Sequence, residues 1–280
     1  MKLYRETLTP QMKVYDDFDD RAETRWLPYV MYFHRANYVS EVINTDRLGF
    51  RLTAGPDGQR ASVGGTVPDG PLRLFAGASS ALGTGATRDA ATLPSRLWCQ
   101  HAPSRPWLNL GGRTYNSLQE ALVLLLHRHL LPQIEEIVIY GGFNNIALAQ
   151  LPESLQGENG AFFFCRDFYD KMEELNESFR KDKPGFGRRG KQAATTLSEE
   201  APAPPLPEMI TRAVTLAGRH LEIWKLLADA AGARLSYVLQ PLAPWWREEP
   251  APQEKLLFDE LDRISKYGSF EKLYGAIATP

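Results

Sequence analysis

The chain has 280 residues, of which 43% are apolar and 24% are charged, a composition typical of a globular protein with one large domain or two small ones. Its 32 basic and 34 acidic side chains leave a formal charge of −2, which gives no general attraction to nucleic acid or to an anionic membrane. The two cysteines are too few for a disulfide framework, and no CxxC motif is present.

Neither a targeting signal nor a membrane segment is visible in the sequence. The first twenty residues contain no apolar run of signal-peptide length, and they become acidic where a signal peptide would be apolar. No stretch approaches the roughly 18 apolar residues of a membrane span. We therefore expect a cytoplasmic protein without a membrane span, and we expect no nucleic acid among its partners.

Residues 1–65 are expected to form a small, β-rich N-terminal appendage. The segments Tyr29–Phe33 and Tyr38–Ile43 are rich in aromatic and β-branched residues, which predicts short strands. Residues 44–50 supply turn-forming side chains, and residues 54–70 are crowded with glycine, proline and aspartate, so both segments are expected to be loops.

From residue 66 to residue 280 the pattern alternates between strands and helices. Short apolar runs bounded by turn residues predict four strands, at Leu72–Gly77, Trp107–Gly111, Ile134–Tyr140 and Leu235–Gln240. Apolar residues at helical spacing predict three helices, at residues 117–131, 209–231 and 253–265. This alternation favours a parallel sheet with helices on both faces.

Residues 180–207 interrupt that pattern. The segment is first basic and glycine-containing and then rich in alanine and proline, which predicts a solvated, mobile insertion rather than a packed element. The alternative that the composition leaves open is a lid that contacts a polyanion.

Three predicted strand ends carry residues with possible catalytic chemistry. Ser79 follows the first strand, Gly112 follows the second and Asn144 follows the third. Because ligands bind at the carboxyl ends of parallel strands, these residues are expected to converge at one edge of the sheet. A serine can act as a nucleophile, and backbone N–H groups with an asparagine amide can stabilise an oxyanion. Each residue alone would also fit a turn or a helix cap.

Together these blocks resemble the SGNH (GDSL-type) esterase and acylhydrolase superfamily. FAGASSALGTGATRDAATLP is similar to the form of the first block with Gly-Gly-Ser-Thr, WLNLGGRTYNSLQE to the glycine-rich second block, and GGFNN to the Gly-x-Asn-Asp block. The resemblance covers about residues 26–150 and implies a three-layer, flavodoxin-like α/β domain over residues 66–280. It maps the nucleophile onto Ser79 and the oxyanion hole onto Gly112, or a neighbour of it, and Asn144.

The resemblance also implies a reaction without a cofactor or a metal. The expected activity is hydrolysis of an acylated small molecule or glycan, or O-acyl (acetyl) transfer. Thr114 and Asn145, which stand beside the oxyanion positions, are expected to bind substrate. Trp245 follows the fourth strand and is expected either to line an acyl pocket or to anchor a hydrophobic lid.

The sequence departs from the family pattern where the base should be. Ala78 replaces the Asp that usually precedes the nucleophile, Asn145 replaces the Asp of the third block, and the chain contains no Asp-x-x-His. Because that motif holds the family's base, a serine without it is a poor nucleophile at neutral pH. The alternative reading is a binding protein with impaired catalysis, or a truncated chain that lacks the catalytic His. The sequence does not indicate an oligomeric state.

None of the five histidines has an evident catalytic or metal-binding context. His127 and His129 do not share a helix face, which argues against a metal site. His101 precedes the second strand at the wrong end for the site, and His220 is expected to be a surface or boundary residue of a helix. His34, in the lead-in, could fold over the site.

Overall fold

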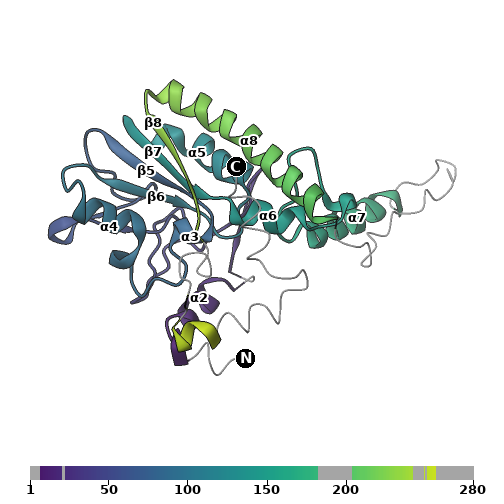
Figure 1. Cartoon of the computed structure of the whole chain (residues 1–280), viewed down its shortest axis with the longest axis horizontal. Helices are drawn as coiled ribbons and strands as arrows, with labels where there is room; N and C mark the ends of the chain where they lie inside the picture. Colours follow the sequence, from purple (N-terminus) through teal and green to yellow (C-terminus); the bar gives the residue numbers. More distant parts are fainter. Residues whose placement is uncertain (1–6, 21–22, 182–203, 242–248, 250, 257–280) are drawn as a thin grey trace.

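The computed structural model describes residues 7–20, 23–181, 204–241, 249 and 251–256 and contains a four-stranded, all-parallel sheet (Figure 1). The strands lie in the order β6-β5-β7-β8. Their bounds are β5 (Leu72–Gly77), β6 (Trp107–Gly111), β7 (Ile134–Gly141) and β8 (Arg234–Leu239). The predicted parallel α/β sheet is therefore confirmed, and its strand order is compatible with a flavodoxin-like layout.

Helices cover both faces of this sheet. α4 (Leu93–Gln100) precedes β6 and packs on one face, whereas α5 (Ser117–His127) and α8 (Leu206–Ala231) pack side by side on the other (Figure 1). The chain moves toward one edge of the sheet from β5 to β6, and toward the other edge from β6 to β7 and then to β8. Because crossovers between parallel strands are right-handed, the connecting helices of these two directions lie on opposite faces.

Local sequence signals explain where the main helices begin and end. Asn116 accepts a hydrogen bond from Gln119 N (2.8 Å) and the Gln119 side chain accepts one from Asn116 N (2.9 Å), a capping box that starts α5. Pro207 lies in the first turn of α8, and Gly232 ends that helix in a left-handed conformation.

Shorter elements complete the described chain. Two short helices, α3 (Ser79–Leu82) and α6 (Phe143–Ala149), follow β5 and β7 directly. The others are α2 (Met12–Phe18), β1 (Arg25–Leu27), β2 (Met31–Phe33), β3 (Thr53–Ala54), η1 (Pro56–Gly58), β4 (Arg60–Ala61), η2 (Asp89–Ala91), η3 (Arg128–Leu130), η4 (Glu153–Leu155) and α7 (Cys165–Lys181).

The strand predicted at Tyr38–Ile43 is wrong. The Ser40 hydroxyl accepts hydrogen bonds from the N–H groups of Val42 and Ile43 and donates to Ile43 O (2.7 Å). These local bonds give the backbone partners that a sheet would otherwise supply, so the segment forms a turn. Val39 is accordingly 81% exposed despite its β-branched side chain.

The predicted insertion at residues 180–207 needs a correction at both ends. Residues 182–203 lie outside the described residues, but Arg180 and Lys181 belong to α7, and Leu206 and Pro207 belong to α8. The predicted helix at residues 253–265 is described only as far as residue 256.

The N-terminal segment shares a hydrophobic core with the sheet. Val30, Phe33 and Phe50 are buried in the same cluster as Leu74 of β5 and Leu108 of β6. The phenyl ring of Phe50 also meets the His127 ring at the end of α5, with ring centroids 4.9 Å apart. The described part of residues 1–65 is therefore packed onto the α/β body.

Arg51 forms the main polar connection between these two parts. Its side chain is fully buried and makes five hydrogen bonds. Nε donates to Asp89 Oδ1 (2.9 Å), Nη1 donates to Gly83 O (2.9 Å) as well as to Leu82 O and the Tyr15 hydroxyl, and Nη2 donates to Val42 O (2.8 Å). The guanidinium thus holds α2, the Ser40 turn and the end of α3 together.

Replacing this guanidinium should destabilise the fold strongly. We expect Arg51→Met to lower the free energy of unfolding by about 3–5 kcal/mol, because it leaves the buried Asp89 carboxylate without its cation. The matched control is Arg35→Met, which removes an ion pair with the exposed Asp17 and should cost at most about 1 kcal/mol. Urea unfolding of both variants measures the difference, and equal effects would contradict the assigned role of Arg51.

Candidate functional site

Ser79 lies where the central strand turns into a helix. β5 ends at Gly77 and α3 begins at Ser79. Gly77 has φ +144°, and a Cβ there would lie 2.1 Å from Tyr140 O, so only glycine lets the chain pass this close to β7. The Ser79 side chain is half-buried, and its Oγ makes no hydrogen bond within the described residues. Its N–H, at the first helical position, has no intrahelical acceptor.

The next residue has a structural partner instead. Ser80 Oγ donates to Gln240 Oε1 (2.6 Å), and Gln240 N donates to Gly141 O (2.9 Å) just past β8. These bonds join the ends of three strands at the carboxyl edge of the sheet. Of the two adjacent serines, only Ser80 has a hydroxyl bonded to another described residue. Gln240 contacts Ser80 from a distant part of the sequence, and no local sequence pattern indicates such a contact.

Asn144 lies in the first turn of α6, just beyond β7. It is 8% exposed, and its Nδ2 donates to Tyr115 O (2.7 Å). An amide nitrogen carries two hydrogens, so one remains for a further acceptor. β5 and β7 are neighbours at the point where the strand order reverses, which is where doubly wound sheets bind ligands. Ser79 and Asn144 are thus brought to the same edge, as predicted for parallel strands.

Gly112 does not have the free N–H that the sequence led us to expect. Its N–H donates to Gly77 O (2.9 Å) and so continues the hydrogen-bond ladder between β5 and β6. The next amide, Arg113 N, donates to His34 Nε2 (3.0 Å). Thr114 adopts φ +63°, and its hydroxyl donates to Arg113 O (2.6 Å). The second block therefore offers neither the Gly112 amide nor the Arg113 amide to an oxyanion in this conformation.

Asn145, which the sequence predicted to bind substrate, uses both ends of its amide in hydrogen bonds with the start of α5. Its Oδ1 accepts from Ser117 N (3.1 Å) and its Nδ2 donates to Ser117 Oγ (2.7 Å). Ser117 Oγ in turn lies 2.6 Å from His220 Nδ1. This chain of bonds connects the first turns of α5 and α6 to α8.

His220 is a buried residue and not the surface or boundary residue that the sequence suggested. It is 1% exposed, and its Nε2 has no hydrogen bond within the described residues. Burial lowers the pKa of the imidazole, so the ring is neutral near pH 7. The helical pattern around it, GRHLEIWK, did not show which face of α8 meets α5.

His34 does fold against the second block, but as a structural residue. Its Nε2 accepts the Arg113 N–H, so the proton is on Nδ1, which donates to Gly49 O (3.1 Å). The ring is fully buried, and burial lowers its pKa to about 4. With both nitrogens engaged, His34 cannot accept a proton from Ser79 in this arrangement.

The remaining histidines are also separate from Ser79. His101 follows α4 and is exposed, and His127 and His129 lie at the end of α5 and in η3, away from the carboxyl edge of the sheet. No histidine therefore forms a hydrogen bond with Ser79 in the described structure. Trp245 lies outside the described residues.

Glu120 is a buried acid that sequence reasoning missed. It is 3% exposed on the inner side of α5, and a Cβ at Gly141 would lie 3.5 Å from each of its carboxylate oxygens. Burial raises its pKa well above the ordinary value. A buried acid thus lies beneath the end of β7, one helical turn from Ser117.

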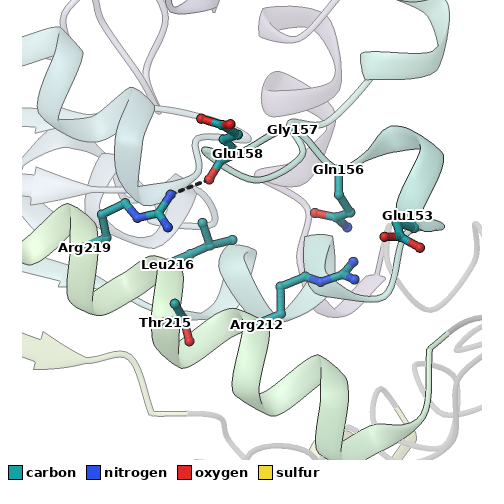
Figure 2. Close-up of a pocket in the computed structure, with 8 residues that line it drawn as sticks. All are labelled: Glu153, Gln156, Gly157, Glu158, Arg212, Thr215, Leu216 and Arg219. Atoms are coloured by element: carbon teal, nitrogen blue, oxygen red, sulfur yellow. Dashed lines mark hydrogen bonds between the residues drawn. The ribbon is translucent and has the colours of Figure 1, made fainter.

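A depression lies between α8 and the loop formed by residues 153–158, which follows α6 in the chain (Figure 2). Its volume is about 390 Å³, with Arg212 and Arg219 on the helix wall and Glu153 and Glu158 on the loop wall. Arg219 Nη1 donates to Glu158 O (2.6 Å), and Arg212 pairs with Glu208. Because opposite charges balance across this cleft, it has no net attraction for an anion.

In the described part of the chain, no group of three or more His, Cys, Asp or Glu side chains could hold a metal ion. Nor is any described helix both long and apolar enough to cross a membrane.

Comparisons with known proteins add no family assignment. The chain matches no protein-family model and no curated protein. A functional conclusion must therefore come from the geometry of the sheet edge.

The Asn145–Ser117–His220 chain of bonds should contribute to stability. We expect Ser117→Ala to lower the free energy of unfolding by about 1–3 kcal/mol, because it leaves Asn145 Nδ2 and His220 Nδ1 without partners. Thr211→Ala is the control, since that exposed hydroxyl bonds only to Pro207 O on the same helix and should cost less than about 0.5 kcal/mol. Chemical denaturation measures the free energy of unfolding of both variants. Similar losses in the two would show that the Asn145–Ser117–His220 bonds do not stabilise the fold.

His34 should make the protein less stable at acidic pH. The folded state keeps the ring neutral down to about pH 4, whereas the unfolded chain takes up the proton near pH 6.5. The free energy of unfolding should therefore fall by about 3 kcal/mol between pH 6.5 and 4 on account of this residue. The measurement compares unfolding of the wild type and His34→Gln across that range, because glutamine can still accept the Arg113 N–H. Parallel pH profiles would contradict the prediction.

Proposed function

We propose that the chain carries an SGNH-type acyl-ester site at the carboxyl edge of its sheet, with Ser79 as nucleophile and Asn144 as an oxyanion donor. The observation that carries this proposal is the placement of two residues at one sheet edge. Ser79, whose hydroxyl has no hydrogen bond among the described residues, begins the helix after the central strand, and Asn144 lies in the first turn of the helix after the neighbouring strand. The sequence blocks around both residues resemble those of that superfamily. The sheet order is compatible with its flavodoxin-like layout.

In the proposed reaction, Ser79 Oγ attacks the acyl carbonyl of an ester of a small molecule or a glycan. The oxyanion that forms accepts hydrogen bonds from Ser79 N–H and from the remaining hydrogen of Asn144 Nδ2. The C–O bond to the alcohol then breaks, and the alcohol leaves with the proton that Ser79 gave up. Water completes a hydrolysis, or a second alcohol completes an O-acyl transfer, and either one restores Ser79.

The proposal needs a base that can accept the Ser79 proton. The five histidines are all in described residues, and none is bonded to Ser79. This observation favours a second candidate, a protein that binds an acyl ester at the same edge but turns it over slowly or not at all. The engaged N–H groups of Gly112 and Arg113 favour the second candidate too.

A fluorophosphonate probe distinguishes these candidates. We expect slow phosphonylation of Ser79 in the 280-residue chain and a rate that rises when imidazole is added, because a base in solution replaces the missing one. Ser79→Ala should abolish the labelling, whereas Ser80→Ala, the adjacent hydroxyl bonded to Gln240, should keep it. Intact-mass and peptide mass spectrometry locate the adduct.

Two results of that experiment would count against the proposal. Labelling that persists in Ser79→Ala would show that another residue is the nucleophile. No labelling of the folded wild type, even with imidazole, would favour the binding protein.

A further inference from the structure

α7 carries a line of apolar residues with the spacing of a coiled coil. Cys165, Phe168, Met172, Leu175 and Phe179 follow one another at intervals of three, four, three and four residues. This is the a/d pattern of a heptad repeat, which produces a narrow seam suited to another helix. We call these five residues the α7 seam. It extends over about 21 Å of helix at 1.5 Å per residue.

Among the residues that the structure describes, the seam packs against the rest of the molecule only in its first turn. Cys165 is buried in a small cluster with Leu148 and Leu155, and the Phe168 ring lies 5.8 Å from that of Phe162. Beyond this point α7 lies at the end of the molecule opposite α4 (Figure 1).

The later seam residues belong to no hydrophobic cluster of the described residues. Met172 is 41% exposed, Leu175 is 47% exposed and Phe179 is 60% exposed. Helices of this length are marginal in water unless an apolar face is covered by tertiary or quaternary packing. The seam is therefore expected to have a partner.

The distribution of charge on α7 indicates what kind of partner fits. The residues that flank the seam are Tyr169, Asn176, Ser178 and one charged residue, Lys171. All the acidic residues of the helix fall at the outer heptad positions, at Asp167, Asp170, Glu173, Glu174 and Glu177. Two identical seams can thus meet without opposed carboxylates. The outer positions carry five acidic and three basic side chains, and this net negative charge gives no attraction to an anionic membrane.

We propose that two copies of this chain associate through their α7 seams as an antiparallel helix pair. The antiparallel direction follows from the attachment of α7, because each body is fixed at the Cys165 end and would crowd the other in a parallel pair. A two-fold axis then packs Met172 against Leu175 of the second copy and Phe168 against Phe179. In an antiparallel pair g positions face g positions, so Lys171 lies opposite the uncharged Ser178 of the second copy.

The pairing is expected to be weak and dependent on concentration. Stable interfaces bury about 1,200–2,000 Å² in total, and two helices of four turns in contact along one seam bury less than that. The association is therefore an equilibrium between monomer and dimer, which is independent of the acyl-ester site at the sheet edge.

Sedimentation velocity on the full chain tests this association. We expect a mass near 31.5 kDa at low micromolar concentration that rises toward twice that value as the concentration increases. Leu175→Glu should abolish the rise, because it places a carboxylate in each seam, without unfolding the chain, since Leu175 is 47% exposed. The matched control is Glu174→Gln, one residue away on the outer face, which should dimerise like the wild type.

Cysteine cross-linking tests the direction of the pair. In a Cys99→Ser background, which removes the exposed native thiol, Met172→Cys combined with Leu175→Cys should form an intermolecular disulfide on mild oxidation. Each single cysteine should cross-link far less, because in an antiparallel pair position 172 of one copy faces position 175 of the other. Efficient cross-linking of the Met172→Cys variant alone would show a parallel pair instead.

Three outcomes of these experiments would overturn the proposal. The first is a wild type that stays monomeric at every concentration, together with a Leu175→Glu variant of lower thermal stability. That pair of results would mean that the seam is covered within one chain. The second is dimerisation that Leu175→Glu leaves unchanged. The third is a monomer that binds phosphatidylcholine–phosphatidylglycerol vesicles through Leu175, which would make the partner a membrane.

Discussion

Arg51 joins three parts of the chain through one buried side chain: α2, the Ser40 turn and the end of α3. A buried guanidinium is costly to remove from water unless each of its donors finds an acceptor, so its carbonyl, carboxylate and hydroxyl partners must all be in place together. Because α3 begins at Ser79 and ends beside Gly83, this requirement fixes the short helix that presents the candidate nucleophile. The N-terminal segment is thus a structural part of the sheet edge.

A second constraint acts on the other side of that edge. Asn109 of β6 donates to the carbonyls of Ala81 and Leu82 in α3, and its Oδ1 accepts from Gly111 N (2.8 Å). Ser80 is bonded to Gln240 beyond β8. The helix after β5 is therefore held by β6, β8 and the N-terminal segment at once. Ser79 remains the residue of this turn whose hydroxyl is not used for support, which is the position expected of a group that meets a ligand.

The strands of the sheet could be predicted from the sequence because each is marked by residues within a short stretch of the chain. β5 and β6 have the predicted bounds, and β7, β8 and α8 differ from prediction by at most a few residues. The buried strands β5 and β6 are short apolar runs closed by turn residues, whereas β8 is mostly exposed and is marked by its β-forming residues and the turn residues on either side. The predictions that were wrong concern residues whose structure depends on contacts with distant parts of the sequence or on local side-chain hydrogen bonds. The Ser40 hydroxyl turned a β-rich segment into a turn, and the contact of α8 with Ser117 buried His220. Apolar spacing indicates that a helix has a buried face, but the element that covers this face follows only from the topology.

His34 shows why the site is the least predictable part of the molecule. From sequence it could be considered as a possible base, because it precedes the first strand and could lie over the edge. The structure does bring it to the second block, yet its Nε2 holds the Arg113 N–H and its Nδ1 is held by Gly49. The same two bonds that place the ring beside the site remove its ability to act as a base there. They also engage the Arg113 amide, so the N-terminal segment that supports the Ser79 turn also occupies a donor that the proposed acyl-ester site could otherwise use. For the Arg113 amide to reach an oxyanion, the bond between Arg113 and His34 would have to break first.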